Sequence, residues 1–124
     1  ADFNLAFRLL ADCIAATSDN FLELFNGDKQ SINNWLGVWR ARLDQQKENM
    51  EEIAVVMRKI NPLYIPRNQN VENVLQAAVE NSDYQPFEEL LTVLSKPFEE
   101  QEGMEKYAAP PVPTGERYRT FCGT

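Results

Sequence analysis

The feature that most constrains the fold is residues 61–68, Asn-Pro-Leu-Tyr-Ile-Pro-Arg-Asn, which interrupts two helical patterns. Pro62 and Pro66 each fix the backbone angle φ at about −65°, remove an amide donor and disfavour helical geometry in the residue before them. A helix that arrives along residues 57–60 must therefore end here. The Leu-Tyr-Ile run between the prolines is too apolar for a solvated linker, which predicts a connector packed on a core.

We interpret this segment as a rigid structural joint carried by Asn61, Pro62, Pro66, Arg67 and Asn68. Asn68 is expected to be the N-cap of a helix that begins at Val71–Glu72, because its side-chain oxygen suits an unpaired amide. Arg67 is the one arginine held on a rigid segment. Its default role is structural, as a partner for a carboxylate of this domain or of a missing one.

Apolar residues recur at spacings of three and four over most of the chain, which is the signature of amphipathic helices. This pattern predicts helices over residues 3–16, 32–46, 50–60, 71–79 and 87–94, with a shorter piece at 21–25. Ser31 is expected to cap the 32–46 helix, and Pro86 to lie in a first turn. No strand pattern is present, so we predict an all-α fold, a compact bundle of five or six helices.

Trp35 and Trp39 lie four residues apart on one of these helices, beside Leu36 and Leu43. This spacing predicts that both tryptophans belong to the core. The alternative is that they stack on a base or a sugar.

The organisation expected is a helical domain over residues 1–97 and an acidic, then Pro-rich, extended C-terminal tail over residues 98–124. Tyr107, Tyr118 and Phe121 indicate that parts of this tail dock on other protein. The chain begins with Ala1 in sequence typical of the middle of a domain, so we expect a fragment of a longer protein.

Composition excludes several functions. A formal net charge of −7 argues against binding nucleic acid or an anionic membrane, and no apolar run reaches the length of about 20 residues that spans a bilayer. Without histidine there is no Ser-His-Asp triad and no His-rich zinc site. The five glycines form no phosphate-cradling cluster, and the paired glutamates 51–52, 88–89 and 99–100 are expected to be solvated.

The ordered set of motifs resembles the C-terminal end of selenoprotein O and its bacterial relatives. The resemblance covers nearly all 124 residues and includes Trp39-Arg40-Ala41-Arg42-Leu43, residues 61–68, Phe87-x-x-Leu90-Leu91-x-x-Leu94, Tyr107-Ala108-x-Pro110-Pro111 and the terminal Tyr118-x-Thr120-Phe121-Cys122-Gly123-Thr124.

This resemblance implies a parent protein with a kinase-like fold that transfers AMP, or in some bacterial relatives UMP, from the nucleotide to protein hydroxyls. ATP and Mg or Mn are then cofactors of the parent, and its partners are the upstream kinase-like domain and protein substrates. A bacterial cytoplasmic location is expected. No catalytic, cofactor-binding or metal-binding residue carries over to this chain, which has no recognisable nucleotide site.

The resemblance also singles out Cys122, which occupies the place of the selenocysteine found in some family members. It implies a redox-reactive thiol, and the alternative is an incidental exposed cysteine. Cys13 lies on the apolar stripe of the first helix and is expected to be an inert core thiol.

Two functional hypotheses follow. The first is a non-catalytic helical domain that braces the kinase-like core and carries a redox-sensitive tail. The second is a free-standing helical protein-interaction module whose Pro-rich tail is a ligand for peptide-binding domains.

Overall fold

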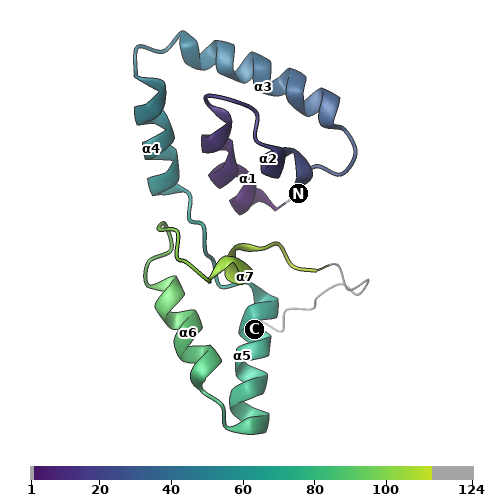
Figure 1. The fold of residues 1–124 in the computed structure, drawn as a ribbon, viewed down its shortest axis with the longest axis vertical. Coiled ribbons are helices and arrows are strands. Elements are labelled where there is room, and N and C mark those ends of the chain that lie inside the picture. Colours follow the sequence, from purple (N-terminus) through teal and green to yellow (C-terminus); the bar gives the residue numbers. More distant parts are fainter. Residues whose placement is uncertain (1, 113–124) are drawn as a thin grey trace, which may run out of the picture. The chain divides into compact units, whose positions relative to one another are not determined.

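The computed structural model describes residues 2–112, and within this range the chain forms helices and connecting segments only (Figure 1). The elements are α1 (Phe3–Leu10), the 3-10 helix η1 (Ala11–Cys13), α2 (Asp19–Glu23), α3 (Lys29–Asp44), α4 (Met50–Ile60), α5 (Asn68–Asn81), α6 (Gln85–Leu94) and α7 (Glu105–Ala108). The all-α fold class is confirmed for the described residues. The short helix α7 was not predicted.

The chain divides into two compact units, unit 1 (Ala1–Leu63) and unit 2 (Tyr64–Thr124). The division falls inside the segment 61–68. Residues 98–112 belong to unit 2 together with α5 and α6. The predicted boundary between a helical domain of residues 1–97 and a tail of residues 98–124 stays a prediction.

In unit 1, α3 and α4 bend around α1 and α2 (Figure 1). The helix predicted over residues 3–16 is shorter, because α1 ends at Leu10 and η1 follows. Asp2 caps α1 by accepting a hydrogen bond from the Leu5 amide at 2.9 Å. The prediction that Ser31 caps the next helix is wrong: α3 begins at Lys29, and Asp28 is its N-cap, accepting from the Ser31 amide at 3.1 Å.

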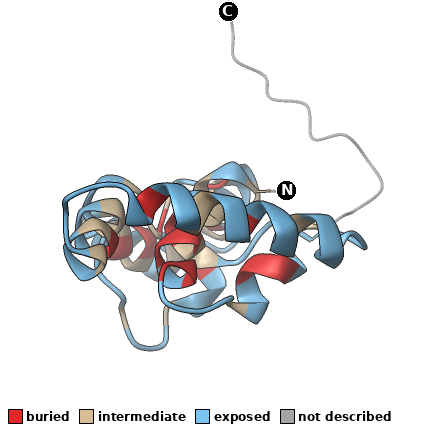
Figure 2. Ribbon diagram, turned by 90° about the horizontal axis from the view of Figure 1, so that it is seen from above, coloured by how far each residue is buried: buried red, intermediate tan, exposed pale blue. Residues whose placement is uncertain are grey.

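The described residues of unit 1 form two clusters of buried residues, and Figure 2 colours the buried positions of the ribbon red. One contains Leu10, Cys13, Phe21, Leu22 and Leu36, and the other contains Ile14, Leu43 and Ala54. Trp39 is half-buried and packs against both clusters, as does Met57. The two clusters are therefore linked through one tryptophan and one methionine.

The prediction that Trp35 belongs to the core is wrong, since its side chain is 49% exposed. Successive helix positions are rotated by about 100°, and the buried line of α3 passes through Leu36 and Leu43. Trp35 lies at the edge of this line and stacks on Trp39, with ring centroids 6.0 Å apart. The helix turns its half-buried Arg40 toward η1 instead, where Nε donates to the Cys13 carbonyl at 2.6 Å.

In unit 2, α5 and α6 form a helical hairpin, and α7 packs beside them (Figure 1). Ser82, the C-cap of α5, adopts a left-handed conformation with φ of 53°, which ends the helix at Asn81, two residues beyond the predicted range of 71–79. Pro86 lies in the first turn of α6, as expected. Among the described residues of this unit, residues 64–112, the buried ones are Tyr64, Arg67, Val74, Leu90, Val93 and Tyr107.

Candidate functional site

The segment 61–68 is the sequence-predicted site, and its first part belongs to unit 1. Asn61 is the C-cap of α4, with the extended backbone that Pro62 imposes (φ −108°, ψ 109°). Its amide and its side-chain amide both donate to the Met57 carbonyl, at 3.0 and 2.8 Å. The end of α4 is therefore closed by Asn61 itself, and the helix ends where the sequence predicted.

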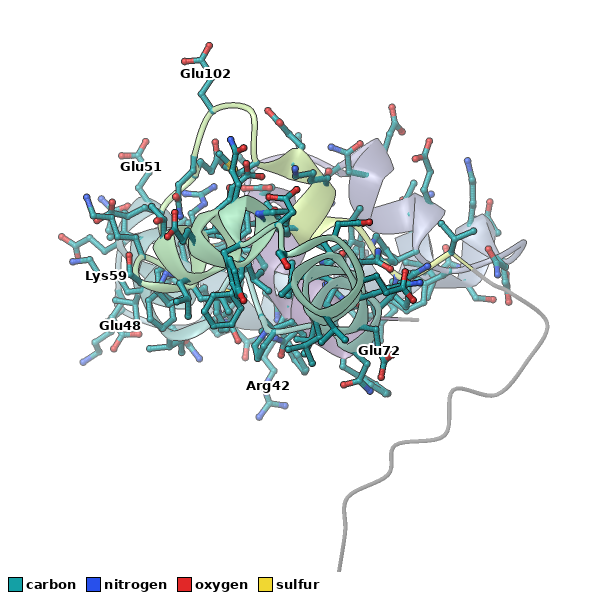
Figure 3. The ribbon with its side chains drawn as sticks, turned by 90° about the horizontal axis from the view of Figure 1, so that it is seen from below. Arg42, Glu48, Glu51, Lys59, Glu72 and Glu102 are labelled. Atoms are coloured by element: carbon teal, nitrogen blue, oxygen red, sulfur yellow. The ribbon has the colours of Figure 1, made fainter. Side chains whose placement is uncertain are left out.

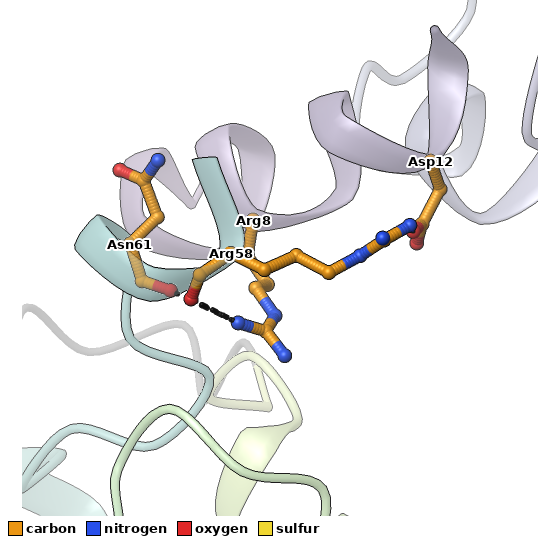
Figure 4. Close-up of polar contacts among 4 residues, drawn as sticks. All are labelled: Arg8, Asp12, Arg58 and Asn61. Atoms are coloured by element: carbon orange, nitrogen blue, oxygen red, sulfur yellow. Dashed lines mark hydrogen bonds and ion pairs between the residues drawn. The ribbon is translucent and has the colours of Figure 1, made fainter. Parts of the chain in front are cut away.

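A buried arginine from α1, which was not predicted from the sequence, also binds this helix end (Figure 4). Arg8 is 7% exposed, and its Nη1 donates to the carbonyls of Arg58 at 2.5 Å and Asn61 at 3.4 Å. The last carbonyls of a helix carry partial negative charge and lack partners within the helix, so a cation is favourable there. Arg8 thus fastens the end of α4 to α1.

Arg58, whose carbonyl accepts from Arg8, lies in the last turn of α4, and its own side chain extends toward Asp12. The Nη2 of Arg58 lies 2.5 Å from Oδ1 of Asp12, and both side chains are more than 40% exposed. Ion pairs this accessible to water are worth little, typically about 0–1 kcal/mol. The buried Arg8 is therefore the stronger tie between α4 and the N-terminal helices.

The second part of the segment belongs to unit 2 and is anchored by Tyr64, which is 2% exposed. The Tyr64 amide donates to the Pro97 carbonyl at 3.1 Å, and its hydroxyl accepts from the Gln101 amide at 3.0 Å. The side chain of Gln101 donates in turn to the carbonyls of Val93 and Lys96, at 3.0 and 3.1 Å. The prediction of an apolar connector packed on a core is confirmed at Tyr64, whose hydroxyl has the partner that a buried tyrosine needs.

The start of α5 differs from the prediction at Arg67 and Asn68. Arg67, not Asn68, is the N-cap of α5, and Asn68 is the first helical residue and exposed, so the predicted Asn68 cap is wrong. Arg67 is 9% exposed, and its Nη2 donates to the Ala108 carbonyl at 3.3 Å. Pro66 is exposed between Ile65 and Arg67, where the Arg67 amide donates to the Ile65 carbonyl at 2.8 Å. The arginine therefore ties the start of α5 to the end of α7.

A polar cluster joins α6 to α7. Oε1 of Glu89 accepts from the Tyr107 hydroxyl at 2.7 Å and lies 2.6 Å from Nζ of Lys106. The hydrogen bonds from Lys106 and Tyr107 lower the pKa of Glu89, and the contact with Glu89 raises the pKa of Lys106. Burial, followed by the bond to Glu89, raises the pKa of Tyr107. Glu89 is thus a structural acceptor rather than only a solvated charge.

The other glutamates of the predicted pairs, at 51, 52, 88, 99 and 100, are exposed, as expected. Figure 3 shows Glu51 and Glu102 pointing away from the ribbon. Among residues 2–112, no group of three or more histidine, cysteine, aspartate or glutamate side chains is placed to hold a metal ion.

Of the two cysteines, Cys13 lies within the part of the chain that the structure describes. Cys13 is fully buried in the core, as predicted, and burial raises the pKa of its thiol. Cys122 lies outside the described residues, as do Tyr118 and Phe121. Tyr107, the third aromatic residue expected to dock, is 5% exposed and packs in unit 2.

The described residues thus define a helical protein whose polar contacts fasten helix ends to one another, and none of its helices is long and apolar enough to cross a membrane. Comparison with known proteins gives the family. The model of the protein adenylyltransferase SelO family matches residues 1–95, and the chain belongs to this family.

Similar proteins include the protein nucleotidyltransferases YdiU of Bradyrhizobium sp. (44% identical), Rhizobium meliloti (46%) and Rhodopseudomonas palustris (43%). Each match covers 100% of this chain but only 25–26% of the relative. The chain therefore spans about a quarter of the length of the curated relatives it matches.

Proposed function

We propose that this chain is the non-catalytic, C-terminal helical region of a SelO-like protein nucleotidyltransferase. The parent transfers AMP, or UMP, from the nucleoside triphosphate to protein hydroxyls, and a kinase-like domain upstream of this chain performs the transfer with ATP and Mg²⁺ or Mn²⁺. Under this proposal the parent works in the bacterial cytoplasm. The role of the helical region, with its joint at Asn61, Pro62, Pro66, Arg67 and Asn68, is to brace that domain.

The use of the basic side chains supports a structural role. Phosphoryl and nucleotidyl transfer need cations held free around the phosphates. Here Arg8 and Arg67 are buried and donate to backbone carbonyls, and Arg40 donates to the Cys13 carbonyl. Arg58 and Lys106 contact the carboxylates of Asp12 and Glu89. Five basic groups are thus committed to acceptors within the chain itself.

Titration calorimetry with ATP and Mg²⁺ tests the proposal on this chain and on the full-length parent side by side. The expected result is saturable binding and transfer of labelled nucleotide to protein with the parent, and neither with the chain alone. The parent is the matched control, because it shows that the nucleotide and metal preparations are competent. Saturable micromolar binding by the chain alone would contradict a non-catalytic role.

For the terminal segment we propose a redox role of Cys122. Its thiol and a cysteine of the rest of the parent form a disulfide, and the two protons and two electrons pass to an oxidant such as oxidised glutathione. Cys13 is a poor partner because it is fully buried. Mass spectrometry of the parent under oxidising conditions should find Cys122 in a disulfide that reductant removes and Cys122→Ser abolishes. Cys122 found free, or joined to Cys13, would refute the proposal.

A further inference from the structure

An apolar groove of about 300 Å³ lies on unit 1 among α1, α2 and α3. Its lining consists of apolar side chains, among them Phe3, Phe7, Phe21, Phe25, Ile32 and Trp35. No charged residue lines it. The groove therefore offers aromatic and aliphatic surface, and its lining has no charged group to orient a polar ligand.

The groove is open to solvent at the side chains that a helical stripe would normally bury. Phe3 is 78% exposed, Phe7 is 53% exposed and Trp35 is 49% exposed, whereas Phe21 on its floor is 3% exposed. Contiguous exposed apolar surface of this kind marks an interaction site in a soluble protein, and aromatic anchors in a pocket carry most of the binding energy of an interface. The groove therefore has the composition of the centre of a protein interface.

We propose that this groove is the surface on which unit 1 docks an apolar segment of the remaining polypeptide of its own parent, the part that carries catalysis. The proposal rests on the proposed function and deepens it by naming the contact surface. The chain spans about a quarter of the length of its curated relatives, so the larger part of such a protein lies outside these residues. That part is covalently attached, and its effective concentration at the groove is high.

The groove does not suit the other occupants as well. A small ligand pocket usually combines apolar walls with a few convergent polar groups, and the residues that line this groove supply no charge. A second copy of the chain would bring a further net charge of −7 against the same charge, which opposes association. The parent's own polypeptide is part of the same molecule, so it reaches the groove without the association of two separate chains.

Hydroxyl-radical footprinting read by mass spectrometry tests the proposal directly. In the full-length parent, the oxidation rates of Phe7 and Trp35 should fall several-fold below those in the 124-residue chain and approach that of Phe21. Tyr84 of unit 2, which is 60% exposed and outside the groove, reports on general changes in accessibility. Equal oxidation of Phe7 and Trp35 in the parent and in the chain would overturn the proposal.

Substitutions give a second, independent measurement. Phe7→Ala and Trp35→Ala should lower the melting temperature of the parent by several degrees more than that of the chain. Val38→Ala is the matched control, because Val38 lies on α3 with Trp35, is 72% exposed and does not line the groove. Equal shifts in parent and chain for Phe7→Ala and Trp35→Ala would mean that the groove contacts nothing further, and would refute the proposal.

Sedimentation of the chain distinguishes the second-copy alternative. A monomer over the working concentration range is expected, and a dimer that Phe7→Ala dissolves would replace the proposed occupant by another copy. The outcome is independent of the calorimetry with ATP. Nucleotide binding by the chain would overturn the proposed function, whereas the docking proposal is decided by the footprinting result.

Discussion

Tyr64 and Tyr107 of unit 2 and Phe7 and Trp35 of unit 1 differ in how far their own unit covers them. In unit 2, Tyr64 and Tyr107 are 2% and 5% exposed, and each hydroxyl has a hydrogen-bond partner. In unit 1, Phe7 and Trp35 lie on apolar helical stripes yet remain about half exposed. An apolar stripe therefore shows that a helix face has to be covered, but it does not show whether the covering protein is part of the same unit.

The two units also close their helix ends by different means. The carbonyls at the end of α6 accept from Gln101, which follows a few residues later in the sequence. The carbonyls at the end of α4 accept from Arg8, 50 residues earlier than Arg58. A hydrogen bond from a charged donor buried at a helix end contributes more to the free energy of unfolding than one from a neutral donor. Removing the charged donor therefore destabilises the fold more.

The largest effect is expected from truncating a buried tyrosine of unit 2. Tyr64→Ala should reduce the free energy of unfolding by roughly 3–5 kcal/mol, because it leaves a cavity and an unpaired Gln101 amide. Tyr84→Ala is the matched control, since Tyr84 is 60% exposed. Urea unfolding followed by circular dichroism measures both. Similar losses for the two variants would erase the distinction between buried and exposed aromatics in unit 2.

The sequence predicted these units unevenly. Helix positions followed from apolar spacing, and the end of α4 at Ile60 followed from the proline at position 62. The caps of α3 and α5 were misplaced, because several neighbouring polar residues could each have served and tertiary packing chose among them. The helix α7 was missed because its four residues are too few for a periodic pattern.

The second effect in size is expected at the end of α4. Arg8→Met keeps most of the apolar stem but removes the donors to the Arg58 and Asn61 carbonyls, and should cost about 2 kcal/mol of unfolding free energy. Arg42→Met is the control, because Arg42 is exposed and points away from the ribbon in Figure 3. Hydrogen exchange should show faster exchange in the last turn of α4 in Arg8→Met alone. Unchanged exchange there would mean that Asn61 closes the helix unaided.

Arg8 also marks the limit of reasoning from sequence in unit 1. It lies between apolar neighbours on α1, where an arginine is ordinarily on the solvent side. Its partners are 50 and 53 residues away in sequence, so no local pattern reveals them. The prediction for Trp35 was wrong for a related reason. Periodicity gives the angular position of a side chain on its helix, but it does not give the width of the face that neighbouring elements cover.

A smaller effect is expected at Trp35, and its neighbour on α3 sharpens the test. Trp35→Ala should cost the chain about 1 kcal/mol, mainly the stacking on Trp39. Leu36→Ala, one residue further on and fully buried, should cost roughly 2–5 kcal/mol. Both are measured by urea unfolding of the same chain. A Trp35→Ala loss as large as that of Leu36→Ala would mean that Trp35 is part of the unit 1 core after all.

The smallest effect is expected from the polar cluster of unit 2, and it appears as a pH dependence. The pKa of Glu89 is lowered from 4.5 by the hydrogen bonds from Lys106 and Tyr107, so its charged form favours the folded state. That contribution is present above the ordinary glutamate pKa and is lost as the pH falls through the lower pKa of the folded state. The pKa values of Tyr107 and Lys106 are raised, so their contributions are present in neutral solution and are lost only as the solution becomes strongly alkaline.

Glu89→Gln separates the charge from the shape of this cluster, because the amide oxygen still accepts from the Tyr107 hydroxyl. The melting temperature of the wild type should fall more steeply than that of Glu89→Gln as the pH is lowered from about 6 to about 3, since only the wild type loses a favourable charge. Glu88→Gln is the control, because Glu88 is exposed on the adjacent position of α6. The steeper wild-type slope should therefore persist in Glu88→Gln. Parallel slopes for the wild type and Glu89→Gln would mean that solvent screens the charge of Glu89 completely and that α7 is held by the burial of Tyr107 and the hydrogen bond from Arg67.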